Sequence, residues 1–234
     1  MPCGGPGSAL NAGPSRNIGQ WCCGILGVTN PALLLSLALI AEARAEPRGA
    51  CFDFDHKITQ PLREPLPLVE GRDNSDFGTY ANGIDWAAGR AVLQMPIASA
   101  YAKLLDHQNV KDMEKTTLST TVLARPGYLQ FHLVDVVVTL RALFVKMKVA
   151  WTEAWGYALV EGKEDDPRKI VISYQKVAGT RHLEWQCGSY VLQARGEAST
   201  DLSLYEEVKA DRRSARDTRD MHAGILRNLR GTGP

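Results

Sequence analysis

Six strand-like stretches separated by short polar turns constrain the fold of this chain more than any other feature. Each stretch alternates apolar and polar residues or is rich in β-branched and aromatic residues, which is typical of strands. The turns are too short to hold the crossover connections that parallel strands need. The pattern therefore predicts an antiparallel meander. Its strands are expected at residues 116–123, 128–139, 143–160, 169–177, 182–194 and 201–210.

One amphipathic helix is expected to follow the meander. Ser214 and Asp217 are spaced as in a capping box, and Gly231 is placed to end the helix. The apolar residues recur at helical spacing and form one face, whereas the arginines lie elsewhere. A helix of this kind needs an apolar surface to pack on. Its apolar face comprises Thr218, Met221, His222, Ile225 and Leu229.

The residues before the meander predict a strand followed by two short helices. Residues 84–95 are typical of a strand interrupted at Gly89, and Pro96 stops it and opens a helix over residues 97–105. A short helical turn is expected around residues 109–113. The complete order predicts an α+β fold, in which a curved antiparallel sheet wraps around the long C-terminal helix.

This order of elements resembles the START-like superfamily, also called the SRPBCC or helix-grip fold. The superfamily includes lipid-transfer START domains, plant Bet v 1 proteins, coenzyme Q-binding proteins and polyketide cyclases. Residues 95–109, with Pro96 opening the helix and Leu104-Leu105-Asp106 closing it, look like the family's first strand, helix and turn. The resemblance covers residues 84–229. It implies a hydrophobic cavity between the sheet and the last helix.

An aromatic wall is expected in the third strand of the meander. Trp151, Glu153, Trp155 and Tyr157 occupy alternate positions, so strand alternation places them on one face. In the functional interpretation this face lines the cavity, and Glu153 meets the polar head of a ligand. In the alternative, the aromatic side chains fill the core and Glu153 pairs with a neighbouring arginine.

The last two strands supply further candidates. In residues 182–191 the face with Leu183, Trp185, Cys187, Ser189 and Val191 is expected to be concave. In the final strand the inward face stays undecided, and a bulge near Glu206-Glu207 would reconcile its two halves. The full set of candidate cavity residues is Trp151, Glu153, Trp155, Tyr157, Tyr174, Trp185, Tyr205, Met221, His222 and Ile225.

The sequence favours a domain that binds a hydrophobic small molecule or lipid without covalent chemistry, and no catalytic residue or cofactor is assigned. One alternative is a cyclase- or aromatase-like enzyme, with His222 as general acid or base beside Tyr174, Tyr205, Glu153 or Glu207. Another is a protein-interaction domain whose cavity is filled by side chains. No structural metal is expected, because the histidines never fall at zinc-ligand spacing.

The charge balance argues against nucleic acid as a partner. The formal net charge is +1, with acids and bases interspersed. A basic cluster near the last helix is diluted by aspartates, so it is interpreted as solvated surface, with transient contact to anionic lipid headgroups as the alternative. The oligomeric state is not predicted. The cluster comprises Lys209, Arg212, Arg213, Arg216 and Arg219.

Residues 1–45 are interpreted as a cleaved signal peptide. An apolar run at residues 32–41 precedes Ala43-Arg44-Ala45, which suits cleavage before Glu46. The folded part would then be periplasmic or secreted. The alternatives are an uncleaved anchor in the inner membrane at residues 22–41, or a disordered leader. A translation start near Val28 would give a more compact signal.

After cleavage, residues 46–82 are expected to form an extended, Pro-rich lead-in and residues 83–231 the START-like domain. Two cysteines remain in this part of the chain, Cys51 and Cys187. In an oxidising compartment they invite one disulfide, which would hold the lead-in against the domain. Two free or buried thiols are the alternative, and the sequence leaves both open.

Overall fold

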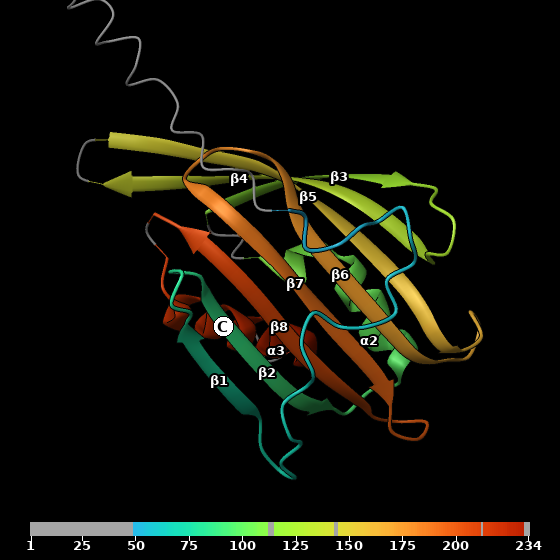
Figure 1. The fold of residues 1–234 in the computed structure, drawn as a ribbon. Coiled ribbons are helices and arrows are strands. Elements are labelled where there is room, and N and C mark those ends of the chain that lie inside the picture. The colour runs from blue at the N-terminus through green and yellow to red at the C-terminus, as the bar shows by residue number, and fades with distance from the viewer. Residues whose placement is uncertain (1–48, 112–114, 143–144, 212, 232–234) are drawn as a thin grey trace, which may run out of the picture. The chain divides into compact units, whose positions relative to one another are not determined.

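The computed structural model describes residues 49–111, 115–142, 145–211 and 213–231, and the proposed signal peptide lies outside these ranges. Its strands form one antiparallel sheet in the order β1-β2-β8-β7-β6-β5-β4-β3 (Figure 1). The expected α+β architecture, an antiparallel sheet with a long C-terminal helix, is confirmed. The strands are β1 Asn74–Thr79, β2 Asp85–Leu93, β3 Thr116–Leu123, β4 Gln130–Ala142, β5 Val145–Gly162, β6 Pro167–Gly179, β7 Leu183–Ala194 and β8 Thr200–Ala210.

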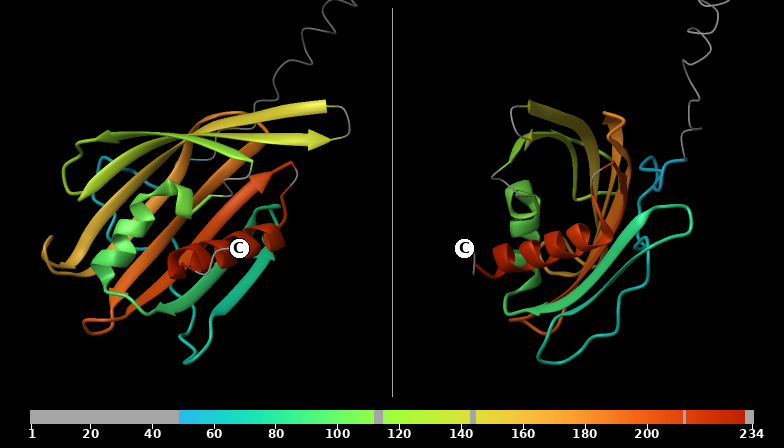
Figure 2. Two further views of the ribbon diagram at one scale, coloured as in Figure 1. Left: turned by 180° about the vertical axis from the view of Figure 1, so that it is seen from behind. Right: turned by 90° about the vertical axis from the view of Figure 1, so that its left-hand side faces the viewer.

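The helices lie on the concave face of the sheet (Figure 2). They are α2 Ile97–Leu105, the 3-10 turn η1 His107–Asn109, and α3 Ala215–Arg230. Helix α3 packs on β2, β1 and β8, whereas α2 packs on β6 and β7. Strand β2, which precedes the meander, pairs with its last strand, β8, and both lie under α3.

Helix α3 begins and ends where the sequence predicts. The Ser214 hydroxyl accepts a hydrogen bond from the Asp217 N–H, and the Asp217 carboxylate accepts one from the Ser214 N–H. Gly231 closes the helix at φ 71°, a conformation that favours glycine. The capping box and the glycine fix both helix ends. His222 and Ile225 are buried, so their face of the helix points to the sheet.

Strand β1 lies within the segment expected to be an extended lead-in. It forms a hairpin with β2, closed by a turn in which the Gly83 N–H donates to the Tyr80 carbonyl at 2.8 Å. Most of its residues are exposed on both faces. Because β1 buries neither face, its sequence carries no apolar alternation that would predict a strand.

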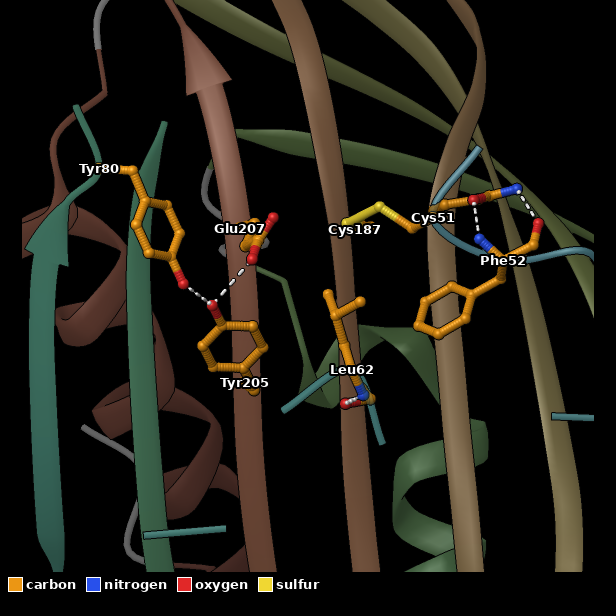
Figure 3. The surroundings of a disulfide bond; sticks show 9 residues. Cys51, Phe52, Leu62, Tyr80, Cys187, Tyr205 and Glu207 are labelled. Carbon is orange, nitrogen blue, oxygen red and sulfur yellow. Dashed lines mark hydrogen bonds between the residues drawn. A yellow bond between two sulfur atoms is a disulfide. The ribbon is translucent and has the colours of Figure 1, made fainter. Parts of the chain in front are cut away.

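The rest of the lead-in crosses the convex face of the sheet. Cys51 forms a disulfide with Cys187 on β7, so of the two alternatives for these cysteines the structure contains the bond (Figure 3). Phe52 and Phe54 are buried beside it. The side chain of Gln175 accepts from the Phe52 N–H at 2.9 Å and donates to the Phe52 carbonyl at 3.0 Å. The sheet therefore has a core on each face.

No helix among the described residues has both the length and the apolarity that crossing a membrane requires.

Candidate ligand-binding site on the concave face

The four residues expected to form the aromatic wall share the concave face. Trp155, Tyr157 and Glu153 are 0% exposed, and Trp151 packs at the margin of the same core. Trp155 stacks on Tyr174 of β6, with ring centroids 4.2 Å apart and an interplanar angle of 10°. The strand alternation of β5 therefore places these residues as the sequence predicts.

Glu153 is fully satisfied by protein groups. Its carboxylate accepts hydrogen bonds from the indole N–H groups of Trp151 and Trp155, each at 2.8 Å. Lys111 completes the set with an ion pair at 2.7 Å. The expected arginine partner is thus wrong, because a lysine from the segment after η1 takes this place. A carboxylate with three donors has little capacity left for a ligand's head group.

A second buried carboxylate, Glu206 of β8, lies beneath α3. It is 0% exposed and accepts hydrogen bonds from the Gln186 amide at 2.8 Å and from Arg213 at 3.2 Å. The sheet register places Trp155, Tyr174, Gly188 and Glu206 side by side on consecutive strands β5, β6, β7 and β8. This transverse row carries the polar groups of the concave face from β5 to β8.

His222 of α3 lies against this row with unpaired ring nitrogens. Its side chain is 2% exposed, its Nε2 lies 4.0 Å from the Glu206 carboxylate, and neither nitrogen has a hydrogen-bond partner among the described residues. Burial, together with the charge of Arg213, lowers the pKa of His222 to about 3. The ring is therefore neutral and offers one N–H donor and one acceptor. The Tyr174 hydroxyl is also buried, and its hydrogen-bonding neighbour is Tyr190.

A pair of histidines adds polar groups at the other end of the row. His107 Nε2 and His132 Nδ1 lie 3.0 Å apart, and His132 Nε2 lies 2.8 Å from the Gln130 amide oxygen. Burial lowers the pKa of His107 to about 3, with Lys111 and His132 adding to the shift. The His107 Nδ1 atom has no hydrogen-bond partner in the part of the chain that the structure describes. Sequence spacing gave no indication of this pair, because η1 and β4 meet only in the folded protein.

Two candidate residues lie on the convex face, so their assignment to the cavity is wrong. Trp185 packs with the lead-in. The Tyr205 hydroxyl bonds to Tyr80 at 2.8 Å and to Glu207 at 2.9 Å (Figure 3). The bulge expected near Glu206-Glu207 is absent, because the register of β8 with both of its neighbours is regular there. The side chains of β8 alternate strictly between the two faces of the sheet, and Glu206 occupies an inward position with its carboxylate buried.

The concave face of β7 is the one opposite to that expected. Gln186, Gly188, Tyr190 and Leu192 point inward, whereas Cys187 and its neighbours of the same parity face the lead-in. The lead-in buries the outer face as deeply as the helices bury the inner one. Apolarity alone therefore cannot distinguish the two faces of this strand.

Gly188 makes room for Tyr174. A Cβ atom added at Gly188 would overlap the Tyr174 hydroxyl and approach the Tyr205 backbone carbonyl. We expect Gly188→Ala to lower the free energy of unfolding by about 1–3 kcal/mol, as overpacking of a core does. In the control Gly224→Ala on α3, the added Cβ would meet only the Arg227 guanidinium at 3.7 Å, so this change should stabilise the protein by up to about 1 kcal/mol. Denaturant titration measures both, and equal effects would contradict the close packing.

The inner residues of the candidate set are buried. Trp155, Tyr157 and Tyr174 are at most 1% exposed, and Ile225 and His222 are 2% exposed. Met221 and Trp151 keep partial exposure at the margin. The inner candidates are therefore screened from solvent, whereas the two at the margin are not. Among the described residues, no group of three His, Cys, Asp or Glu side chains is arranged to hold a metal ion.

The basic cluster is largely neutralised by local ion pairs. Lys209 pairs with Glu184 at 2.8 Å, Arg219 with Asp220 at 2.6 Å, and Arg213 with the buried Glu206. Arg212 lies outside the described residues.

Comparisons with known proteins return likeness of fold alone. No family model and no curated protein matches the sequence. The human StarD13 lipid transfer and protein localization domain is 10% identical over 72% of this chain and 87% of its own, with a TM-score of 0.48. Zhui aromatase/cyclase from Streptomyces sp. R1128 is 13% identical over 64% and 93%, at 0.40. A STAR-related lipid transfer protein from Xanthomonas axonopodis is 14% identical over 68% and 97%, at 0.44.

Proposed function

We propose that this START-like domain binds a hydrophobic small molecule or lipid between the concave sheet and α3, with the ligand's polar end at His222. The observation that carries the proposal is the unpaired, completely buried imidazole of His222. An unsatisfied polar group in a core costs about 1–3 kcal/mol. A ligand carbonyl or hydroxyl that bonds to the ring would remove this cost when it binds.

The surroundings of His222 match an amphipathic ligand. The Tyr174 hydroxyl adds a second buried polar group beside Tyr190, and burial raises its pKa well above the usual range, so it keeps its proton. The rest of the concave core is apolar, with Leu202, Leu204 and Ile225 among its members. A ligand with one polar end and an apolar body would satisfy both regions. Because these side chains are closely packed, they must move apart to admit it.

Native mass spectrometry of the purified protein tests this proposal. We expect the wild type to retain a lipid-sized mass. His222→Leu should retain about tenfold less, because one lost hydrogen bond of about 1.4 kcal/mol weakens binding by that factor. The control is Ala223→Leu on the exposed side of α3, which should retain as much as the wild type.

The proposal is wrong if the wild type carries no ligand and its tryptophan fluorescence is unchanged by a panel of phospholipids, sterols and quinones. Trp155 is a suitable reporter, because it stacks on Tyr174 in the transverse row. An apolar ligand that entered there would alter the stacking.

A second candidate function is a protein-interaction domain with a filled concave face. The complete burial of Trp155, Tyr157 and Tyr174 favours it, because all three side chains belong to one packed core cluster. The absence of a bound mass together with unchanged fluorescence would support this candidate. In the enzyme alternative, Tyr205 and Glu207 cannot act together with His222, because both side chains lie on the convex face of the sheet.

Export remains part of the proposal. The disulfide between Cys51 and Cys187 supports it, because such bonds persist in oxidising compartments. The intact mass from the same spectra gives the first residue of the mature chain. A chain that begins at Glu46 would support cleavage, whereas an intact leader in the membrane fraction would support the anchor at residues 22–41.

A further inference from the structure

Strand β3 is a free edge of the sheet with exposed apolar side chains. It ends the strand order and pairs only with β4 among the described strands. Residues 119–123 are all exposed, with Val122 at 62% and Leu123 at 40%. In Figure 1 this strand lies at the end of the sheet remote from β1. A free edge offers unpaired backbone groups to another strand.

The ladder with β4 shows which backbone groups are free. The Thr139 N–H donates to the Lys115 carbonyl at 2.8 Å, so these two residues form a hydrogen-bonded pair. Bonded and non-bonded pairs alternate along an antiparallel ladder. Thr117, Ser119 and Thr121 therefore bond to β4. The N–H and carbonyl groups of Thr116, Leu118, Thr120 and Val122 point away from it.

Nothing in β3 protects this edge. Thr116–Leu123 contains no charged residue and no proline, and its register with β4 has no bulge. Natural proteins guard free edges with such features. The opposite edge, β1, contains Asp76 and Gly78. The β1 edge of the sheet therefore carries a charged residue and a glycine that disfavour pairing, whereas the β3 edge is suited to pairing with another strand.

We propose that two copies of this protein pair through β3, antiparallel and around a two-fold axis at Ser119. In this register Leu118 lies opposite Thr120 of the other copy, and Thr116 lies opposite Val122. Each residue whose backbone N–H and carbonyl point away from β4 therefore lies opposite another such residue. In a two-fold interface a strand pairs with the same strand of the other copy. A charged side chain on the strand would therefore usually lie near a side chain of the same charge. An uncharged strand avoids this repulsion, which is why a second copy is the partner that fits.

Sedimentation and light scattering over a dilution series test the pairing. We expect the wild type to be a dimer and Thr120→Pro to weaken dimerisation at least about 100-fold, because proline removes an N–H at the centre of the interface. The same N–H makes no bond to β4, so the monomer should keep its fold and its thermal midpoint. The matched control Thr120→Ala keeps the N–H and should dimerise like the wild type.

Cysteine cross-linking tests the register. Ser119 faces its own copy in a non-bonded pair, where Cα atoms lie about 4.5 Å apart, so Ser119→Cys should form an intermolecular disulfide readily. Thr117→Cys faces Thr121 of the other copy and should cross-link poorly. A wild type that stays monomeric up to about 100 µM, a dimer insensitive to Thr120→Pro, or equal cross-linking at both positions would overturn the proposal. Capture of an unrelated extended peptide by a monomer would overturn it as well.

Discussion

Replacing Cys51 and Cys187 together by alanine is expected to lower the free energy of unfolding by about 3–5 kcal/mol. The bond joins residues separated by 136 positions, so it restricts a large loop in the unfolded chain. The conformational entropy that the unfolded chain loses through a cross-link rises with loop length. For a domain whose total stability is about 5–15 kcal/mol, this is a large share.

The structure also indicates what should survive the loss of the disulfide. Phe52 and Phe54 stay buried on the convex face, and Gln175 still bonds to the Phe52 backbone. The Leu62 N–H still donates to the Ser189 hydroxyl at 2.8 Å. We therefore expect a folded but weakened protein, in which the lead-in near residue 51 exchanges its amide hydrogens faster.

Equilibrium unfolding in urea of the wild type and the double alanine variant measures the effect. The single variant Phe52→Ala, with the disulfide intact, separates the packing of the lead-in from the cross-link. Reductant is a poor substitute for mutation, because Cys187 is 0% exposed in the folded protein. A difference below about 1 kcal/mol between wild type and double variant would contradict the stabilising role.

The sequence predicted the course of the chain better than the faces of its strands. The meander, Pro96 and the capped last helix follow from local patterns, and each forms where expected. On β5 the large side chains all have one parity, so Trp151 and Trp155 could be placed correctly. Local pattern is sufficient when one face of a strand carries every large residue.

Strand β7 shows where local pattern fails. Both of its faces are buried, one by the helices and one by the lead-in, so Trp185 and Tyr190 are equally compatible with a core. The cysteines contained the missing information. A bond between Cys187 and Cys51 requires Cys187 to face the lead-in, and alternation then turns Trp185 outward with it. Taking the disulfide as given would have corrected this face.

The polar groups of the site were the least predictable part. Glu206 occupies an inward position of β8 and is completely buried. In the sequence an acidic residue at this position interrupts the apolar pattern, so it does not indicate a core residue. His107 and His132 lie on different elements and meet only through the fold. Buried polar partners are set by tertiary contacts, which a single sequence does not display.

Acidification is expected to destabilise the protein strongly through His222. Burial holds the pKa of this ring at about 3 in the folded state, against 6.5 for an ordinary histidine. The neighbouring Glu206 carboxylate does not reverse this, because Arg213 already pairs with it. The folded state therefore favours the neutral ring. The contribution of His222 to stability is complete above pH 6.5 and is lost as the pH falls from there towards about 3.

The size of the loss follows from the difference in pKa. Each pH unit in this window costs about 1.4 kcal/mol, so His222 alone should remove about 3 kcal/mol between pH 7.5 and pH 4.5. His107, whose pKa burial also lowers to about 3, should add a loss of the same sign. Leucine at position 222 cannot take up a proton. His222→Leu should therefore abolish the part of the pH dependence of stability that His222 causes.

Urea unfolding of both proteins at the two pH values tests this. We expect the stability of His222→Leu to fall by about 3 kcal/mol less than that of the wild type over this interval. Ala223→Leu, one residue along α3 on its exposed side, should retain the full pH dependence. Equal slopes for the wild type and His222→Leu would mean that the ring is already protonated or solvated in the folded protein. The same result would remove the basis for placing a ligand's polar end against a neutral, unpaired imidazole.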